Sequence, residues 1–278
     1  MGGINVKHLQ DTVKLHNGTE MPWVGLGVYK VDEATEVEQA VETALETGYR
    51  SIDTASFYDN EAGVGRAVKR SGVPEDEIFI TTKVWNDQQG YEETLRAFEA
   101  SREKLGMDID LYLIHWPVKE TYRDTWRALE KLYARGDVRA VGVSNFEPHH
   151  LQELRQVSDL VPMVNQVEYH PWLAQKELLE YCRTNGIQLE AWSPLTRGRK
   201  LDDPIVGRIA GRHGKTPAQV ILRWDLQQEV VTIPKSVTPA RIRENADIFD
   251  FELSAEEQRE LNALDAGIRF GKHPDEFA

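Results

Sequence analysis

Eight short apolar runs occur along the chain at intervals of roughly 30 residues, and they restrict the fold more than any other feature. Each run has the length of a buried strand, and most contain the β-branched side chains that favour strands. Amphipathic stretches with helical spacing lie between them. The runs span residues 23–28, 49–53, 78–84, 111–115, 138–144, 163–168, 187–193 and 230–234. This alternation predicts an α/β protein, a (β/α)8 TIM barrel.

Several of the intervening stretches have recognisable helix boundaries. Residues 216–227 and 254–264 both open with a hydroxyl residue that has Gln or Glu three positions later, the pattern of a capping box. Residues 91–105 carry apolar side chains at three- and four-residue steps. Glycines suited to left-handed C-terminal caps follow four helical patterns, at Gly48, Gly106, Gly136 and Gly186.

A doubly wound sheet is the main alternative to the barrel. It would carry a GxGxxG turn after the first strand, and WVGLGVYKVDE lacks the third glycine. Before the barrel, residues 12–22 form two short runs around Asn17-Gly18, which predicts a β-hairpin that closes the bottom of the barrel. We expect one domain over residues 1–278, with the C-terminal tail 267–278 near the substrate pocket, either draped over it or disordered.

The charge balance and the single cysteine limit the class of protein. Lys and Arg number 33 against 46 Asp and Glu, a formal net charge of −13, which argues against nucleic-acid binding. Cys182 has no intrachain partner and is expected in the core, with a role as nucleophile as the alternative. The sequence contains no long uncharged apolar stretch and no signal-peptide core. We therefore expect a cytoplasmic monomer that needs no membrane and no obligate protein partner.

Titratable side chains stand at consecutive predicted strand ends. Asp53 ends the second run with Tyr58 just beyond it, Lys83 lies at the end of the third, and His115 ends the fourth. Strand C-termini of such a barrel meet at one rim, so we expect these four side chains to lie together. Taken singly, each has a simpler interpretation as a loop cap, a surface ion pair or a structural histidine.

Together these four residues suggest proton transfer to a carbonyl. A phenol has a reference pKa of about 10, and a neighbouring ammonium lowers it towards the working range. Asp53 would keep Lys83 charged and in place, while His115 would orient a substrate oxygen beside the Tyr58 hydroxyl. Such a site would protonate the oxygen of a carbonyl as its carbon receives a hydride.

The motifs DTASFY, TTKVW, YLIHWP, GVSNF, VNQVEYHP, WSPL and IPKSVTPARIRENADIFDFELS occur in this order along nearly the whole chain. With them the sequence resembles the aldo-keto reductase superfamily, and is most similar to bacterial reductases of glyoxals, methylglyoxal and 2,5-diketo-gluconate. The resemblance implies a TIM-barrel, NADPH-dependent reductase of small carbonyl compounds. It matches Asp53, Tyr58, Lys83 and His115 to the catalytic tetrad, with Tyr58 as general acid.

The same resemblance assigns the cofactor site. It places Ser144, Asn145 and Gln166 on the nicotinamide carboxamide and stacks Trp192 on the ring, although barrel-top packing is the alternative for Trp192. The full predicted set is Gly27, Val28, Ser144, Asn145, Gln166, Trp192, Ser193, Leu195, Lys235, Ser236, Val237, Thr238, Arg241, Glu244 and Asn245.

Two cations distinguish the adenosine-phosphate segment. Lys235 and Arg241 flank the start of a helix opened by Thr238-Pro239, an arrangement that suits a phosphate dianion. We therefore predict a preference for NADPH over NADH, with a solvated surface pair as the alternative. The short loop 194–204 predicts looser cofactor enclosure and faster NADP+ release, with Leu195 and Arg197 at the pyrophosphate.

Four aromatic residues are predicted to line the substrate mouth: Tyr29, Phe57, Trp85 and Trp116. Core filling is the alternative for Trp85. The pair His149-His150 invites a metal-site interpretation, but no third ligand stands at zinc spacing, and we expect an exposed pair pointing apart near a helix start. The predicted reduction needs no metal.

Two other functions remain compatible with the sequence. Lys83 at a barrel strand end would suit a Schiff-base aldolase, against which the Tyr58 partner and the cofactor segment argue. A non-enzymatic NADPH-binding redox sensor on the same fold is the second, against which the complete tetrad argues.

Overall fold

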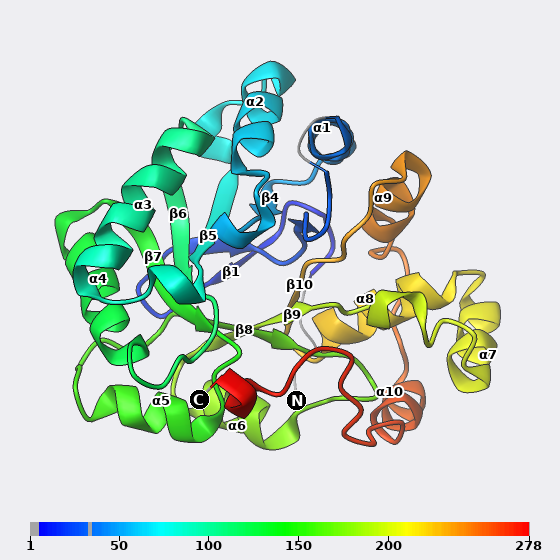
Figure 1. The fold of residues 1–278 in the computed structure, drawn as a ribbon. Helices are drawn as coiled ribbons and strands as arrows, with labels where there is room; N and C mark the ends of the chain where they lie inside the picture. Colours follow the sequence, from blue (N-terminus) through cyan, green and yellow to red (C-terminus); the bar gives the residue numbers. More distant parts are fainter. Residues whose placement is uncertain (1–5, 33–34, 278) are drawn as a thin grey trace.

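The computed structural model describes residues 6–32 and 35–277, and its centre is a single sheet of eight parallel strands (Figure 1). The strands follow one another in chain order around the sheet. Parallel bridges join Val24 to Thr232 and Gly27 to Lys235, so the last strand meets the first and the barrel closes. The strands are β3 (Leu26–Gly27), β4 (Ser51–Asp53), β5 (Phe79–Val84), β6 (Ile109–Ile114), β7 (Val138–Ser144), β8 (Val164–Glu168), β9 (Gln188–Trp192) and β10 (Val231–Thr232).

The eight predicted strands and the barrel are confirmed, with differences at their ends. Regular pairing in β3 and β10 covers only two residues each. Backbone hydrogen bonds continue past them, from Gly25 N to Thr232 O at 3.0 Å and from Gly27 N to Pro234 O at 3.3 Å. Pro234 has no N–H to donate, which limits a regular ladder at this seam.

Helices surround the strands on the outside of the barrel (Figure 1). The capping boxes predicted at Thr216 and Ser254 are both present. Among the described helices, none has the length and apolar character needed to cross a membrane. The helices are α1 (Glu36–Thr47), α2 (Glu61–Ser71), α3 (Tyr91–Leu105), α4 (Tyr122–Arg135), α5 (Pro148–Arg155), α6 (Lys176–Thr184), α7 (Pro204–His213), α8 (Pro217–Gln227), α9 (Pro239–Ala246) and α10 (Ala255–Asn262).

The predicted hairpin lies at the N-terminal ends of the barrel strands. Strand β1 (Thr12–Lys14) pairs antiparallel with β2 (Glu20–Pro22). Asn17 Nδ2 and Thr19 Oγ1 in its turn both donate to the backbone oxygen of Arg139, at 3.0 and 3.1 Å. Arg139 lies at the beginning of β7, so the hairpin covers the bottom of the barrel as expected.

The C-terminal tail crosses the opposite end of the barrel, close to β8 and β9 (Figure 1). The backbone N–H groups of Phe270 and Gly271 donate to the two carboxylate oxygens of Glu168, at 2.7 and 2.9 Å. The ring of Phe277 lies 4.5 Å from that of Trp116. Because Glu168 ends β8 and Trp116 follows β6, the tail lies at the C-terminal rim of the strands, where it was expected.

Cys182 is buried in α6 against the core. Burial raises the pKa of its thiol to about 12, so the thiolate needed by a nucleophile is not formed near neutral pH. The prediction of a packing role is confirmed.

Candidate active site

The four residues of the predicted tetrad lie together at the C-terminal rim. Asp53 ends β4, Tyr58 closes the 3₁₀ turn η1 (Ser56–Tyr58), Lys83 lies in β5, and His115 follows β6. Lys83 Nζ is 2.6 Å from Asp53 Oδ1 and 3.3 Å from the Tyr58 hydroxyl. The rings of Tyr58 and His115 are 5.7 Å apart. Neighbouring parallel strands thus bring these side chains within contact of one another.

Lys83 is held in one position by three acceptors. Besides Asp53 and Tyr58, its ammonium donates to the backbone oxygen of Thr54 at 2.9 Å, so all three N–H groups are used. Lys83 has no exposed side-chain surface. Burial alone would lower its pKa, but Asp53 and Tyr58 outweigh burial and raise that pKa above its usual value. The ammonium therefore stays charged beside the phenol.

The pKa of Tyr58 differs from the sequence expectation. Burial raises it to about 12, although Lys83 lowers it in the predicted direction. Removing the phenol from water disfavours the phenolate more than one ammonium favours it. Tyr58 is therefore a neutral phenol near pH 7 and holds its proton until a stronger base develops beside it.

His115 is also neutral, and here burial and Lys83 act in the same direction. Burial and the positive charge of Lys83 hold the pKa of its imidazole well below the usual value. A neutral imidazole donates a hydrogen bond through one nitrogen without adding a positive charge. His115 can therefore orient a polar substrate atom while Lys83 remains the nearby cation.

The predicted aromatic residues stand around the tetrad. Tyr29 lies 5.1 Å from Tyr58, ring to ring, and Phe57 stacks on Trp85 at 3.7 Å. The Trp85 ring is in turn 5.0 Å from that of His115. Tyr29 and Phe57 are 36% and 48% exposed, which places large apolar surfaces at the solvent side of the rim. Trp116, paired with the tail, completes the predicted set.

The residues predicted to hold a carboxamide are tied together through Gln166. Its backbone oxygen accepts from Ser144 Oγ at 2.7 Å and from the Asn145 N–H at 2.9 Å. Asn145 has a left-handed φ of 63°, and its Nδ2 donates to the backbone oxygen of His115 at 3.0 Å. Asn145, just after β7, thereby connects the backbone of β8 to that of His115.

Trp192 faces this amide group and the tail. Its indole N–H donates to Asn145 Oδ1 at 2.8 Å. On the other side, a Cβ added to Gly271 would lie only 2.4 Å from Cη2 of Trp192, so a larger residue at this closest approach of the tail would have to displace the indole. The indole is therefore at the rim, beside the predicted carboxamide residues and against the tail.

The predicted phosphate-binding segment starts at the end of β10 and continues into α9. Lys235 bridges to β3, and Arg241 lies in the first turn of α9. Both cations are exposed, and within the described part of the chain no carboxylate pairs with either. Glu244 is tied to Thr216 Oγ1 at 2.9 Å, and Asn245 is buried. The remaining members precede the helix and are Ser236, Val237 and Thr238.

The other predicted cofactor contacts lie at the ends of β3 and β9. A Cβ on Gly27 would be 2.9 Å from the backbone oxygen of Ile233, so packing between strands by itself explains this glycine. The next residue, Val28, is fully buried. After β9, Ser193 has a left-handed φ of 49° and begins a tight turn that includes Leu195.

Sequence analysis missed two buried acids that lie beside the predicted site. Glu168 ends β8 and anchors the tail, and Glu190 lies in β9 beside Gln166. A signal existed for each, because both are charged residues inside runs that otherwise predict buried strands. Neither acid is exposed at all.

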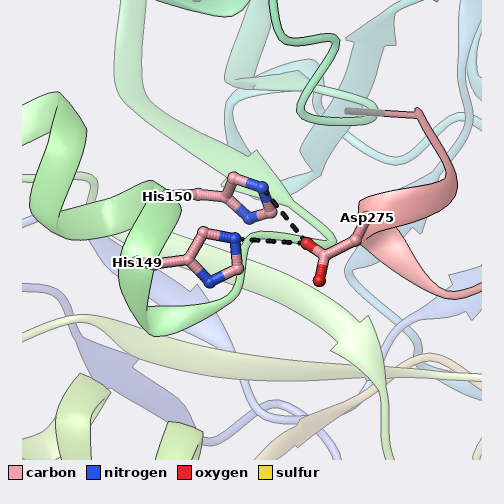
Figure 2. Close-up of side chains that lie close together, drawn as sticks. All are labelled: His149, His150 and Asp275. Carbon is pink, nitrogen blue, oxygen red and sulfur yellow. Dashed lines mark ion pairs between the residues drawn. The ribbon is translucent and has the colours of Figure 1, made fainter.

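The histidine pair of α5 lies differently from the expectation. His149 is exposed as expected, but the prediction that His150 is exposed and that the rings point apart is wrong: the ring centroids are 3.9 Å apart, and His150 is buried. Both Nε2 atoms face Asp275 Oδ1 of the tail, at 3.2 and 3.5 Å (Figure 2). The third potential ligand thus comes from a residue more than a hundred positions away in sequence.

The surroundings of His150 favour a contact between α5 and the tail over a metal site. Its Nδ1 accepts from the backbone N–H of Glu147 at 3.1 Å, as part of a capping box at the start of α5. Burial lowers the pKa of His150 to about 4, so near pH 7 the imidazole is neutral and its single N–H is on Nε2, which faces Asp275 Oδ1 at 3.5 Å. A protonated Nε2 offers no lone pair to a metal ion.

The fold and the tetrad geometry together define a class of reductase. The chain belongs to the aldo/keto reductase family, whose sequence pattern matches residues 23–266.

Individual relatives agree with this assignment over almost the full chain. The chain is 61% identical over 270 residues to a glyoxal reductase of Bacillus subtilis (strain 168), covering 97% of this chain and 98% of the relative. It is 47% identical over 274 residues to methylglyoxal reductase DkgA of Yersinia pestis, with the same coverage. A crystal structure of an aspartate-to-alanine mutant of Gox0644 in complex with NADPH superposes with a TM-score of 0.92, at 44% identity, covering 96% of this chain and 98% of that one.

Proposed function

We propose that this protein is an NADPH-dependent reductase that converts small aldehydes and ketones, of the glyoxal, methylglyoxal and 2,5-diketo-gluconate kind, to alcohols, with Tyr58 as general acid. The observation that carries the proposal is the contact of the buried Lys83 ammonium with both Asp53 and the Tyr58 hydroxyl. The similarity to a glyoxal reductase and a methylglyoxal reductase supports this choice of substrate class.

The residues present fit a phosphorylated dinucleotide. Exposed Lys235 and Arg241 stand near the N-terminus of α9 without carboxylate partners in the described chain, where a phosphate dianion would be stabilised. At the other end, hydroxyl and amide groups of Ser144, Asn145 and Gln166 converge beside Trp192. We assign the phosphate to the first group and the nicotinamide carboxamide to the second.

When bound, NADPH supplies the hydride that the carbonyl carbon accepts. His115 and Tyr58 orient the carbonyl oxygen, and negative charge that develops on this oxygen makes it a stronger base than the phenolate. Tyr58 then gives its proton to the oxygen, which completes the alcohol. Lys83 stabilises the phenolate left behind, and Asp53 keeps the ammonium in place. Water subsequently returns a proton to Tyr58.

The aromatic side chains around the tetrad favour small carbonyl compounds as substrates. Tyr29, Phe57 and Trp85 surround the tetrad with apolar rings, and Trp116 with Phe277 adds a further wall from the tail side. Such surfaces exclude water from the reacting oxygen and accept compact carbonyl compounds.

The direct test compares Tyr58→Phe with the matched control Tyr49→Phe. Tyr49 is another buried phenol, but its hydroxyl donates to the backbone oxygen of Ile242, away from the tetrad. NADPH oxidation with methylglyoxal should fall about a hundredfold to ten-thousandfold in Tyr58→Phe and persist in Tyr49→Phe. NADPH should still bind to both variants.

Other outcomes identify the alternatives. NADPH binding without turnover by the wild-type protein, on a panel of aldehydes and ketones, would indicate a redox sensor. Trapping of a substrate on Lys83 by borohydride would indicate a Schiff-base enzyme. Full activity of Tyr58→Phe would refute the assignment of the general acid.

A further inference from the structure

Glu190 is a fully buried acid that has no part in the reaction described above. It lies in β9 directly opposite Gln166 of β8 in the strand register. Gln166 Nε2 is 2.9 Å from Glu190 Oε2 and 2.7 Å from Asp53 Oδ2. One amide nitrogen therefore bridges two carboxyl groups, and one of these belongs to the tetrad.

This bridge determines which way the Gln166 amide points. The nitrogen of the amide has two N–H groups, and each has one carboxyl oxygen as acceptor. Turning the amide over would place Oε1 against Asp53 Oδ2 at hydrogen-bonding distance, with no proton between them, because Asp53 is paired with Lys83. The two acids thus leave Oε1 of Gln166 as the atom available to a ligand.

We propose that Glu190 is a positioning residue of the hydride-transfer site: together with Asp53 it holds the Gln166 amide so that Oε1 can accept a hydrogen bond from the nicotinamide carboxamide. This inference rests on the proposed function, in which Gln166 binds that group. A continuous series of hydrogen bonds then links the cofactor site to the general acid. It runs from Glu190 through Gln166, Asp53 and Lys83 to Tyr58.

The protonation state of Glu190 suits this role. Burial and the nearby Asp53 charge raise its pKa to about 8, so near pH 7 it is a neutral acid that still accepts through its oxygen. The charged groups that act on it are Asp53 and Lys83, and its register partner on β10 is the uncharged Val231. A neutral Glu190 leaves Asp53 as the carboxylate that balances Lys83.

The test uses two substitutions of similar length. Glu190→Met removes the acceptor while roughly conserving volume, and we expect NADPH binding, followed by quenching of protein fluorescence, to weaken about tenfold. The kcat with methylglyoxal should fall by a similar factor, with the KM for the carbonyl little changed. Glu190→Gln keeps an acceptor oxygen and should restore both values to within about threefold of wild type.

Infrared spectroscopy reports the protonation of Glu190, and a control variant separates the positioning role from simple loss of stability. In wild type, the infrared band of a protonated carboxyl should disappear as the pH rises through about 8, and Glu190→Gln should lack this change. The control is Asp225→Asn, which alters another fully buried acid, bonded to Thr232 Oγ1 away from Gln166. It should change thermal stability and leave NADPH binding as in wild type.

The outcomes that would overturn the proposal are distinct from failure of the proposed function. A Glu190→Met protein that binds NADPH as tightly as wild type, or a Glu190→Gln protein as impaired as Glu190→Met, would refute the positioning role while reduction by wild type stands. Absence of reduction by wild type would instead refute the function. If Glu190→Met does not fold, Glu190→Thr, too short to reach Gln166, takes its place with the same expected loss.

Discussion

Two groups of cations near the same rim differ in their exposure and in their pairing with acids. Lys83 has no exposed side-chain surface and donates all three of its N–H groups to acceptors within the protein. Lys235 and Arg241 are exposed, and no carboxylate of the described chain pairs with them. The buried cation is fixed before any ligand arrives, which suits stabilisation of a transition state, whereas the exposed cations are available to a ligand's own charge. The predictions below test this contrast.

The largest effect is expected from Lys83→Met. Loss of the ammonium leaves the Asp53 carboxylate buried without its counter-charge, so the free energy of unfolding should fall by about 3–5 kcal/mol, and reduction should be lost. Denaturant unfolding and NADPH oxidation measure the two effects.

The double variant Lys83→Met with Asp53→Asn sharpens this result. It removes both charges, so it should recover much of the stability without recovering activity. Recovery of activity in the double variant would contradict the role assigned to the buried pair.

Arg241→Ala should have a smaller and more selective effect. Loss of one charged contact to a phosphate should reduce the preference for NADPH over NADH in kcat/KM by about tenfold, with stability unchanged. Arg243→Ala, a cation further along the same exposed helix, is the matched control and should preserve the preference. An unchanged preference in Arg241→Ala would make Lys235 and Arg241 an ordinary surface pair.

Salt should weaken the NADPH binding that depends on the exposed cations by a few-fold, and should hardly affect the step that depends on buried Lys83. Exposed charges are screened over a distance of about 10 Å at 0.1 M ionic strength, while buried pairs are screened far less. Raising the ionic strength from 0.05 to 0.5 M, roughly a threefold reduction of this distance, should therefore weaken NADPH binding and leave kcat at saturating NADPH nearly constant. Equal salt sensitivity of NADPH binding and of kcat would contradict the contrast between exposed and buried cations.

The smallest effect concerns the protonation of the buried His150 in α5. The pKa of His150 is about 4 in the folded protein and about 6.5 in an unfolded chain, so the unfolded state binds more protons between these values. The stability that neutral His150 contributes is therefore present above pH 6.5 and lost as the pH falls towards 4. His150→Gln should flatten this pH dependence by about 1 kcal/mol per pH unit in unfolding experiments between these two pKa values. A slope equal to that of wild type would count against the burial of a neutral His150.

The barrel and the meeting of the tetrad could be predicted because they follow from topology. Parallel strands in chain order bring their C-terminal ends to one rim, so the position of Lys83 or His115 in its own run was enough. The pKa of Tyr58 could not be predicted in this way. It depends on how completely the surrounding rings and strands remove water from the phenol, and this is a property of packing.

Contacts between distant segments were also outside the reach of local patterns. Phe270 and Gly271 meet Glu168 across about a hundred residues, and Asp275 meets His150 across a longer interval. Neither tail segment carries a periodicity that indicates a partner. Glu190 was missed for a different reason, because a strand pattern reports which face is buried and gives no register with the neighbouring strand.

The opposite positions of the hairpin and the tail decide how this protein is best attached to a bead, an electrode or a fusion partner. A linker joined beyond Phe277 would emerge beside Trp116, at the proposed substrate mouth. An anchor placed at the Asn17-Gly18 turn, on the underside of the barrel, would keep the reactive face directed towards the bulk solution.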